Sequence, residues 1–164
     1  MNASIVDTFN GLPLHVLVVH AAVILTPTAA IVALALVRPS WRMALRWPAA
    51  IAVFGAWLLV WLARASGTAL ATSISAQLKG TPTGAAVMKH MGFANRLNVV
   101  LFTLAVVLVL FALLLPKLAR PAGTVGAVVI AVLALMVLGL VAQTGEAGAR
   151  AAWNPDGSQD YSVK

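Results

Sequence analysis

The stretch LNVVLFTLAVVLVLFALLL, residues 97–115, decides the fold. It contains no charged residue, and Arg96 and Lys117 lie just outside it. A helix needs about 20 mostly apolar residues to cross a hydrocarbon core of about 30 Å. This stretch therefore predicts a membrane-spanning helix, and it directs the search for further spans along the chain.

Three other segments meet the same requirement of length and apolar composition. The predicted spans are 14–37, 48–66, 97–115 with a helical lead-in from residue 85, and 122–143, followed by a polar tail over 144–164. The connections between them leave no room for a separate soluble domain. We expect residues 1–164 to form a single all-α domain, a bundle of four transmembrane helices.

The composition excludes several classes of protein. The chain is 62% hydrophobic and only 9% charged, against about 45–50% and about 25% in ordinary soluble domains. The net charge is +7, and the basic residues lie at the ends of apolar runs. This placement favours lipid over nucleic acid as the partner. No nucleophile–base pair, phosphate loop or paired-carboxylate site is visible, and cysteine is absent. The sequence therefore favours a protein that is not a classical enzyme.

The orientation in the membrane follows from the short basic loops. Arg38, Arg42 and Arg46 lie between the first two spans, and Lys117 and Arg120 lie between the last two. Short loops rich in lysine and arginine stay in the cytoplasm. We therefore predict a multi-pass protein of the plasma membrane, with both termini and the long middle connection on the extracytoplasmic side.

Small residues and span ends have expected structural roles. Gly145 and Gly148 would allow close helix approach, which suits a bundle, an oligomer or a larger complex. Arg64 ends the second span, and Arg150 follows the fourth. The two halves of the chain share no motif, so the sequence predicts no inverted repeat.

The predicted topology brings His15, His20, His90 and Glu146 towards the outer face. His15 and His20 are five residues apart, which places them about 140° apart around a helix. One can face the bundle interior while the other faces elsewhere, so a pair of ligands for one metal within this helix is disfavoured. Each histidine could equally donate to a backbone carbonyl and serve only packing.

Two chemistries would use such a cluster. Imidazoles from two helices can ligate haem b, and the sequence favours His20 and His90 as that pair, with electron transfer as the function. Alternatively, the nitrogen and oxygen donors of His15, His20, His90 and Glu146 could hold an unidentified metal for binding or transport. Glu146 also stands four residues before Arg150, and a helical ion pair is the favoured explanation for it. The remaining alternative is a structural or accessory subunit of a membrane complex with packed histidines.

Three stretches carry a resemblance to a known family. GLPLHVLVVHAAVILTP, KHMGFANRLN and GLVAQTGEAGARAAW resemble the corresponding segments of the DUF2231 family of four-helix membrane proteins of unknown function. The resemblance implies that the family's histidines fall on His15, His20 and His90, whereas Glu146 stands where a histidine is common. Relatives fused to cytochrome c-type modules imply electron transfer with a membrane or periplasmic redox partner.

Overall fold

The computed structural model describes residues 8–160, and the last four residues of the predicted tail lie outside this range. Its long elements are helices, confirming the all-α four-helix bundle. The elements are β1 (Thr8–Phe9), β2 (Leu12–Pro13), α1 (Leu14–Leu34), η1 (Ala35–Val37), η2 (Pro39–Trp41), α2 (Arg42–Ser73), α3 (Ser75–Leu78), α4 (Pro82–Leu114), η3 (Leu115–Lys117) and α5 (Arg120–Trp153).

A small β-hairpin precedes the first helix. Thr8 pairs with Pro13, and Phe9 pairs with Leu12. Asn10 and Gly11 form the turn with φ angles of 49° and 79°, the left-handed region that two-residue hairpin turns require. The hairpin ends directly at the first residue of α1, so it fixes where that helix begins.

Four helices are long and apolar enough to cross a membrane, so the fold is that of a multi-pass membrane protein in contact with lipid. The first span coincides with the predicted 14–37. The other three helices are longer than predicted: α2 has 32 residues and is about 48 Å long, beyond the core of about 30 Å. Most of the extra length lies where α2 and α5 end and where α4 begins. These three helices therefore continue beyond the predicted spans at the end of the bundle that carries His15.

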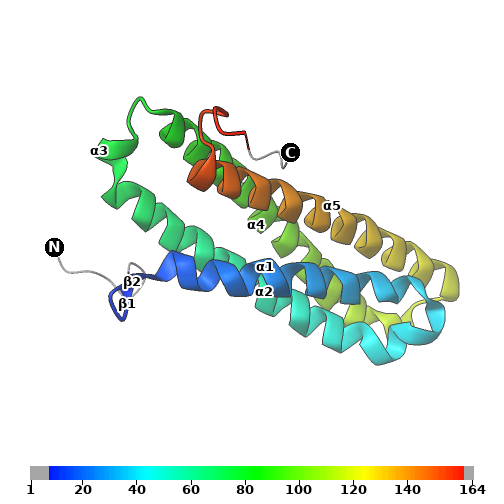
Figure 1. Cartoon of the computed structure of the whole chain (residues 1–164). Helices are drawn as coiled ribbons and strands as arrows, with labels where there is room; N and C mark the ends of the chain where they lie inside the picture. Colours follow the sequence, from blue (N-terminus) through cyan, green and yellow to red (C-terminus); the bar gives the residue numbers. More distant parts are fainter. Residues whose placement is uncertain (1–7, 161–164) are drawn as a thin grey trace.

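The four long helices form two hairpins that pack side by side (Figure 1). In the first, α1 runs against α2, and in the second, α4 runs against α5; α2 also packs on α4, and α1 on α5. Small residues such as Ala30, Ala33 and Ala49 are fully buried, whereas Ile24 and Ile51 are 66% and 69% exposed. This distribution suits a membrane protein, because close packing of small residues, not burial of large ones, holds helices together in lipid.

The first helices of the two hairpins share one pattern of buried positions. Counted from His15 and from His90, six buried residues of each hairpin fall at the same spacings. They are Ala22, Thr26, Ala29, Ala30, Ala33 and Leu36 in the first hairpin, and Leu97, Leu101, Leu104, Ala105, Leu108 and Phe111 in the second. Each residue of the second set lies 75 positions after its counterpart. The two helices therefore present the same face to the core.

The second helices repeat the relationship with an offset of 81 positions. The buried counterparts are Arg42, Ala49, Val53, Ala56 and Ser66 in α2, and Gly123, Ile130, Ala134, Val137 and Ala147 in α5. Figure 1 shows α1 and α4 running in the same direction. The chain thus contains a parallel internal repeat of one helix hairpin, which the sequence motifs did not predict.

Candidate functional site

A cavity of about 610 Å³ opens between the two hairpins at the end of the bundle that carries His15 and His90. The volume lies within the range of about 300–1,000 Å³ typical of small-molecule sites. Most of the lining is apolar and comes from both hairpins in equivalent pairs: Val60 with Val141, Ala22 with Leu97, and Ala71 with Ala152. The internal repeat therefore gives the cavity an approximate two-fold symmetry.

His15 lies at the start of α1, on the wall of this cavity. Its Nδ1 is 2.8 Å from the carbonyl oxygen of Ala63 in α2. The ring lies against Gly67, where a Cβ atom would come within 2.9 Å of the imidazole. Gly67 therefore leaves the room that brings the ring onto the neighbouring helix.

His90 has the same arrangement in the second hairpin. Its Nδ1 is 2.9 Å from the carbonyl oxygen of Thr144 in α5. The ring lies against Gly148, where a Cβ atom would come within 3.1 Å. In each hairpin the accepting carbonyl lies four residues before the glycine, so the two histidine sites are copies of one another.

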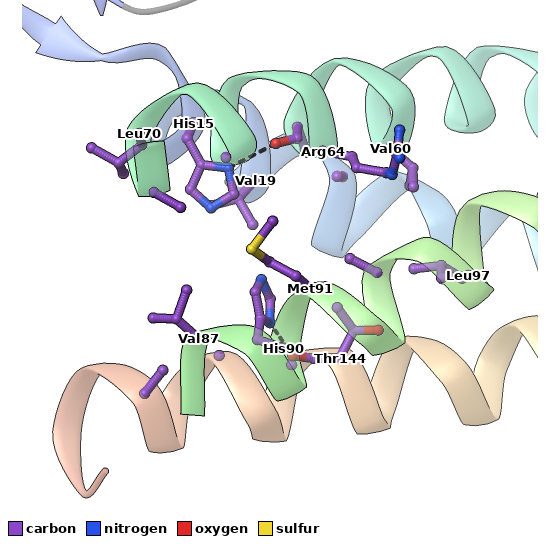
Figure 2. A pocket seen from close by; sticks show the side chains of 18 of the residues that line it. His15, Val19, Val60, Arg64, Leu70, Val87, His90, Met91, Leu97 and Thr144 are labelled. Atoms are coloured by element: carbon purple, nitrogen blue, oxygen red, sulfur yellow. Dashed lines mark hydrogen bonds between the residues drawn. The ribbon is translucent and has the colours of Figure 1, made fainter. Parts of the chain in front are cut away.

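These contacts set the chemistry of both rings. A carbonyl oxygen can only accept, so Nδ1 carries the proton, and Nε2 of the neutral ring has a free lone pair. Figure 2 shows the rings on opposite walls, with the other nitrogen of each turned into the cavity. Within residues 8–160 neither Nε2 has a hydrogen-bond partner. Fixing one nitrogen of a histidine in this way is how proteins orient metal-ligating imidazoles.

His20 lies elsewhere. Its side chain is exposed and does not line the cavity, and its Nδ1 is 2.5 Å from the carbonyl oxygen of Val16 in its own helix. His15 and His20 do diverge around α1, as their spacing predicted, but His15 faces inward. The pair that faces across the cavity is therefore His15 and His90, not the expected His20 and His90, because the buried stripe of α1 is in phase with His15.

Glu146 and Arg150 form an ion pair on the outside of α5. Arg150 Nε donates to Glu146 at 3.0 Å, and the two side chains are 59% and 64% exposed. Over residues 8–160 no group of three or more histidine, cysteine or acidic side chains is close enough to hold a metal ion. The four residues His15, His20, His90 and Glu146 are thus not brought together as the metal hypothesis required.

Three further residues complete the cavity, and two of them, Met91 and Gly67, escaped the sequence analysis. Asn95 accepts a hydrogen bond from Nε of Arg64 across the α2–α4 contact, at the cavity rim. Met91 lines the cavity, and Figure 2 shows its sulfur between the two imidazoles in that view. Gly67 received no attention because it lies in the less apolar connection after the second predicted span. The sequence signal that could have identified Gly67 is its spacing. Gly67 lies four residues after Ala63, as Gly148 lies four residues after Thr144.

A second, smaller hollow of about 270 Å³ lies on the surface between α1 and α2. Ala29, Ala52 and Gly55 line it, and a Cβ atom on Gly55 would meet nothing within 4 Å. It is the kind of small-residue surface on which another helix can pack closely. The accessory-subunit hypothesis required such a surface, and no residue of this hollow lines the cavity.

Compared with protein-family models, curated proteins and solved structures, the chain matches none. The resemblance to the DUF2231 family therefore stays a prediction.

Proposed function

We propose that this membrane protein binds haem b between its two helix hairpins, where His15 and His90 would hold the iron, and that it carries electrons near the outer face. One observation carries the proposal. Two imidazoles from different hairpins each have Nδ1 bound to a backbone carbonyl and turn Nε2 towards the other across an apolar cavity.

The surrounding residues suit a flat apolar macrocycle. Gly67 and Gly148 remove the side chains that would displace the imidazoles. Val60 and Val141 supply equivalent apolar wall positions, one from each hairpin. When bound, haem supplies one-electron chemistry, and its potential is set by the axial ligands and by burial. The hydrogen bonds from Nδ1 hold both rings in place.

The test is a reduced-minus-oxidised visible spectrum of the detergent-purified protein expressed with haem available. We expect sharp low-spin bands in the wild type. His15→Ala and His90→Ala should lose them, whereas His20→Ala should retain them and serves as the matched control on the same helix. A featureless wild-type spectrum, or loss of the bands in His20→Ala alone, would overturn the proposal.

A second candidate rests on Met91. A thioether and two imidazoles are ligands that suit Cu(I), and all three line the same cavity. In this alternative the protein holds copper through His15, His90 and Met91. Metal analysis of the purified protein distinguishes the two, because copper at one equivalent without a haem spectrum supports the second candidate and contradicts the first.

A further inference from the structure

The cavity has one fixed positive charge at its rim. Apart from the two histidines, Arg64 is the one ionisable residue that lines the cavity within the described part of the chain. Its Nε donates to Oδ1 of Asn95, which ties α2 to α4. The two terminal nitrogens have no other hydrogen-bond partner within residues 8–160. The guanidinium of Arg64 is thus held through Nε. The N–H groups of its two terminal nitrogens remain available, and their planar arrangement matches a carboxylate.

The internal repeat shows that this charge has no counterpart on the opposite side. The position equivalent to Arg64 in the second hairpin is Gly145, and the position equivalent to Asn95 in the first is His20. A Cβ atom on Gly145 would meet nothing within 4 Å. His20 bonds to its own helix. The α1–α5 edge of the cavity is therefore open and uncharged, whereas the α2–α4 edge carries a guanidinium.

We infer that Arg64 is a carboxylate-binding subsite that fixes the in-plane orientation of a flat, acidic ligand. The ligand's carboxylates lie at the α2–α4 edge, and its apolar edge lies at the α1–α5 side beside Gly145. The inference rests on the proposed function, since haem b carries both of its carboxylates on one edge of the ring. It adds a residue that recognises the ligand without touching its iron.

The depth of Arg64 in the membrane agrees with this role. Its side chain is exposed, and it lies near the end of the predicted second span, where we expect apolar surroundings to give way to water. A carboxylate placed there keeps partial hydration while an N–H fork binds it, which makes a charge-assisted hydrogen bond favourable. The acidic group of Glu146 is engaged by Arg150 on the outside of α5, so it does not compete for the rim.

The experiment compares two ligands that differ only in their carboxylates. The apo-protein is titrated with haemin and with haemin dimethyl ester, and the Soret band is followed. We expect Arg64→Met to weaken haemin binding about tenfold, as loss of one charge-assisted contact implies, and to leave the ester unchanged. Arg64→Lys should recover part of the affinity. Arg150→Met, which removes an exposed arginine outside the cavity, is the matched control.

The outcomes separate this inference from the proposed function. If the wild type forms a low-spin complex but binds haemin and the ester equally, the carboxylate subsite is wrong and the axial ligation stands. Equal weakening of both ligands by Arg64→Met also overturns the subsite, because it indicates a purely structural role. If the wild type forms no low-spin complex with either ligand, the proposed function and the subsite fail together.

Discussion

The imidazole of His90 lies on the backbone of Gly148, where a Cβ atom would come within 3.1 Å of two ring atoms. The ring reaches the carbonyl of Thr144 only because this space is free. A glycine in the middle of a helix costs up to about 1 kcal/mol relative to alanine. The position of the histidine ring explains why a glycine stands at this point of α5.

The two glycines should therefore respond to alanine differently from other helical glycines. Gly67→Ala and Gly148→Ala should displace a histidine ring and lower haem affinity at least tenfold, with an overpacking cost of about 1–3 kcal/mol. Gly55→Ala and Gly139→Ala, in the same two helices, meet nothing within 4 Å and should stabilise by about 0.4–1 kcal/mol. Haem titration and thermal unfolding in detergent measure both effects. Unchanged haem binding in Gly148→Ala would contradict the assigned ring position.

Met91→Leu separates the two candidate occupants of the cavity. Leucine has a similar volume but no sulfur, so the cavity walls should be preserved. Haem affinity should change less than about threefold, because the imidazoles remain. A Cu(I) site would lose one of its soft ligands and weaken strongly. The two measurements are a haem titration and a copper-binding assay with a colorimetric competitor. Strong weakening of copper binding by Met91→Leu identifies copper as the ligand, whereas an unchanged haem affinity is the result expected for a haem site.

Arg42 should contribute to stability at the opposite end of the bundle. It is buried, and it donates to the carbonyl of Leu36 at 3.0 Å, to that of Val37 at 3.2 Å and to the Thr124 hydroxyl at 3.2 Å. Arg42→Lys keeps the positive charge that sets topology but cannot make three such bonds. We expect a loss of about 1–3 kcal/mol in the free energy of unfolding, measured in mixed micelles.

The control for Arg42 is Arg38→Lys. Arg38 is exposed, and Nε has one hydrogen bond, to Ser40. We expect this variant to change the free energy of unfolding by less than about 0.5 kcal/mol. Equal effects of the two substitutions would show that the buried contacts of Arg42 do not stabilise the loop.

The tail after α5 carries a group whose pKa can be measured. The backbone N–H of Ser158, and next its hydroxyl, donate to Asp156 and hold the pKa of that carboxyl below its ordinary value of 3.8. The charged form is thus favoured in the folded turn, so this contribution is present above pH 3.8 and is lost as the pH falls through the lowered pKa. Ser158→Ala should raise the pKa towards 3.8 in a carboxyl-carbon NMR titration. An unshifted value in the wild type would contradict the turn.

The orientation predicted from the basic loops is testable because the chain has no cysteine. Ser75→Cys at the start of α3 should react with a membrane-impermeant maleimide in intact cells. Ser40→Cys in η2 should react only after the cells are opened. Both serines are exposed, so access to the reagent is decided by the side of the membrane. The reverse pattern would place both termini in the cytoplasm.

The sequence predicted the four spans because long apolar runs have few alternatives in a membrane. It did not predict how far α2 and α5 continue, since a hydropathy pattern reports the part of a helix that lies in lipid. The extended ends of these two helices carry Gly67 and Gly148, whereas His90 lies in the part of α4 that was predicted as a helical lead-in. One half of each histidine site therefore lies in a segment that was expected to be a connection or a tail.

The choice of His20 over His15 has a physical explanation. Depth in the apolar run favoured His20, because ionisable groups there are costly and usually functional. The rotation of α1 about its axis decides which of the two histidines faces the core. Apolarity cannot indicate this rotation, because lipid and the protein core are equally apolar. The informative signal was residue size: Ala22 and Ala29 follow His15 at intervals of seven residues, and both are buried. The buried residues at the same interval from His90 are Leu97 and Leu104, so residue size gives this signal only in the first hairpin.

The internal repeat has a consequence for how such a site can be assembled. Each hairpin contributes one histidine, one accepting carbonyl and one glycine to the cavity. Two copies of a single two-helix chain, associated about a two-fold axis, would build the same chamber with two identical edges. Joining the halves in one polypeptide removes that constraint, so one edge can hold Arg64 and Asn95 while the equivalent positions, Gly145 and His20, place no charged side chain on the cavity wall. A symmetric dimer could not tell one edge of its ligand from the other, whereas a fused chain is free of that restriction.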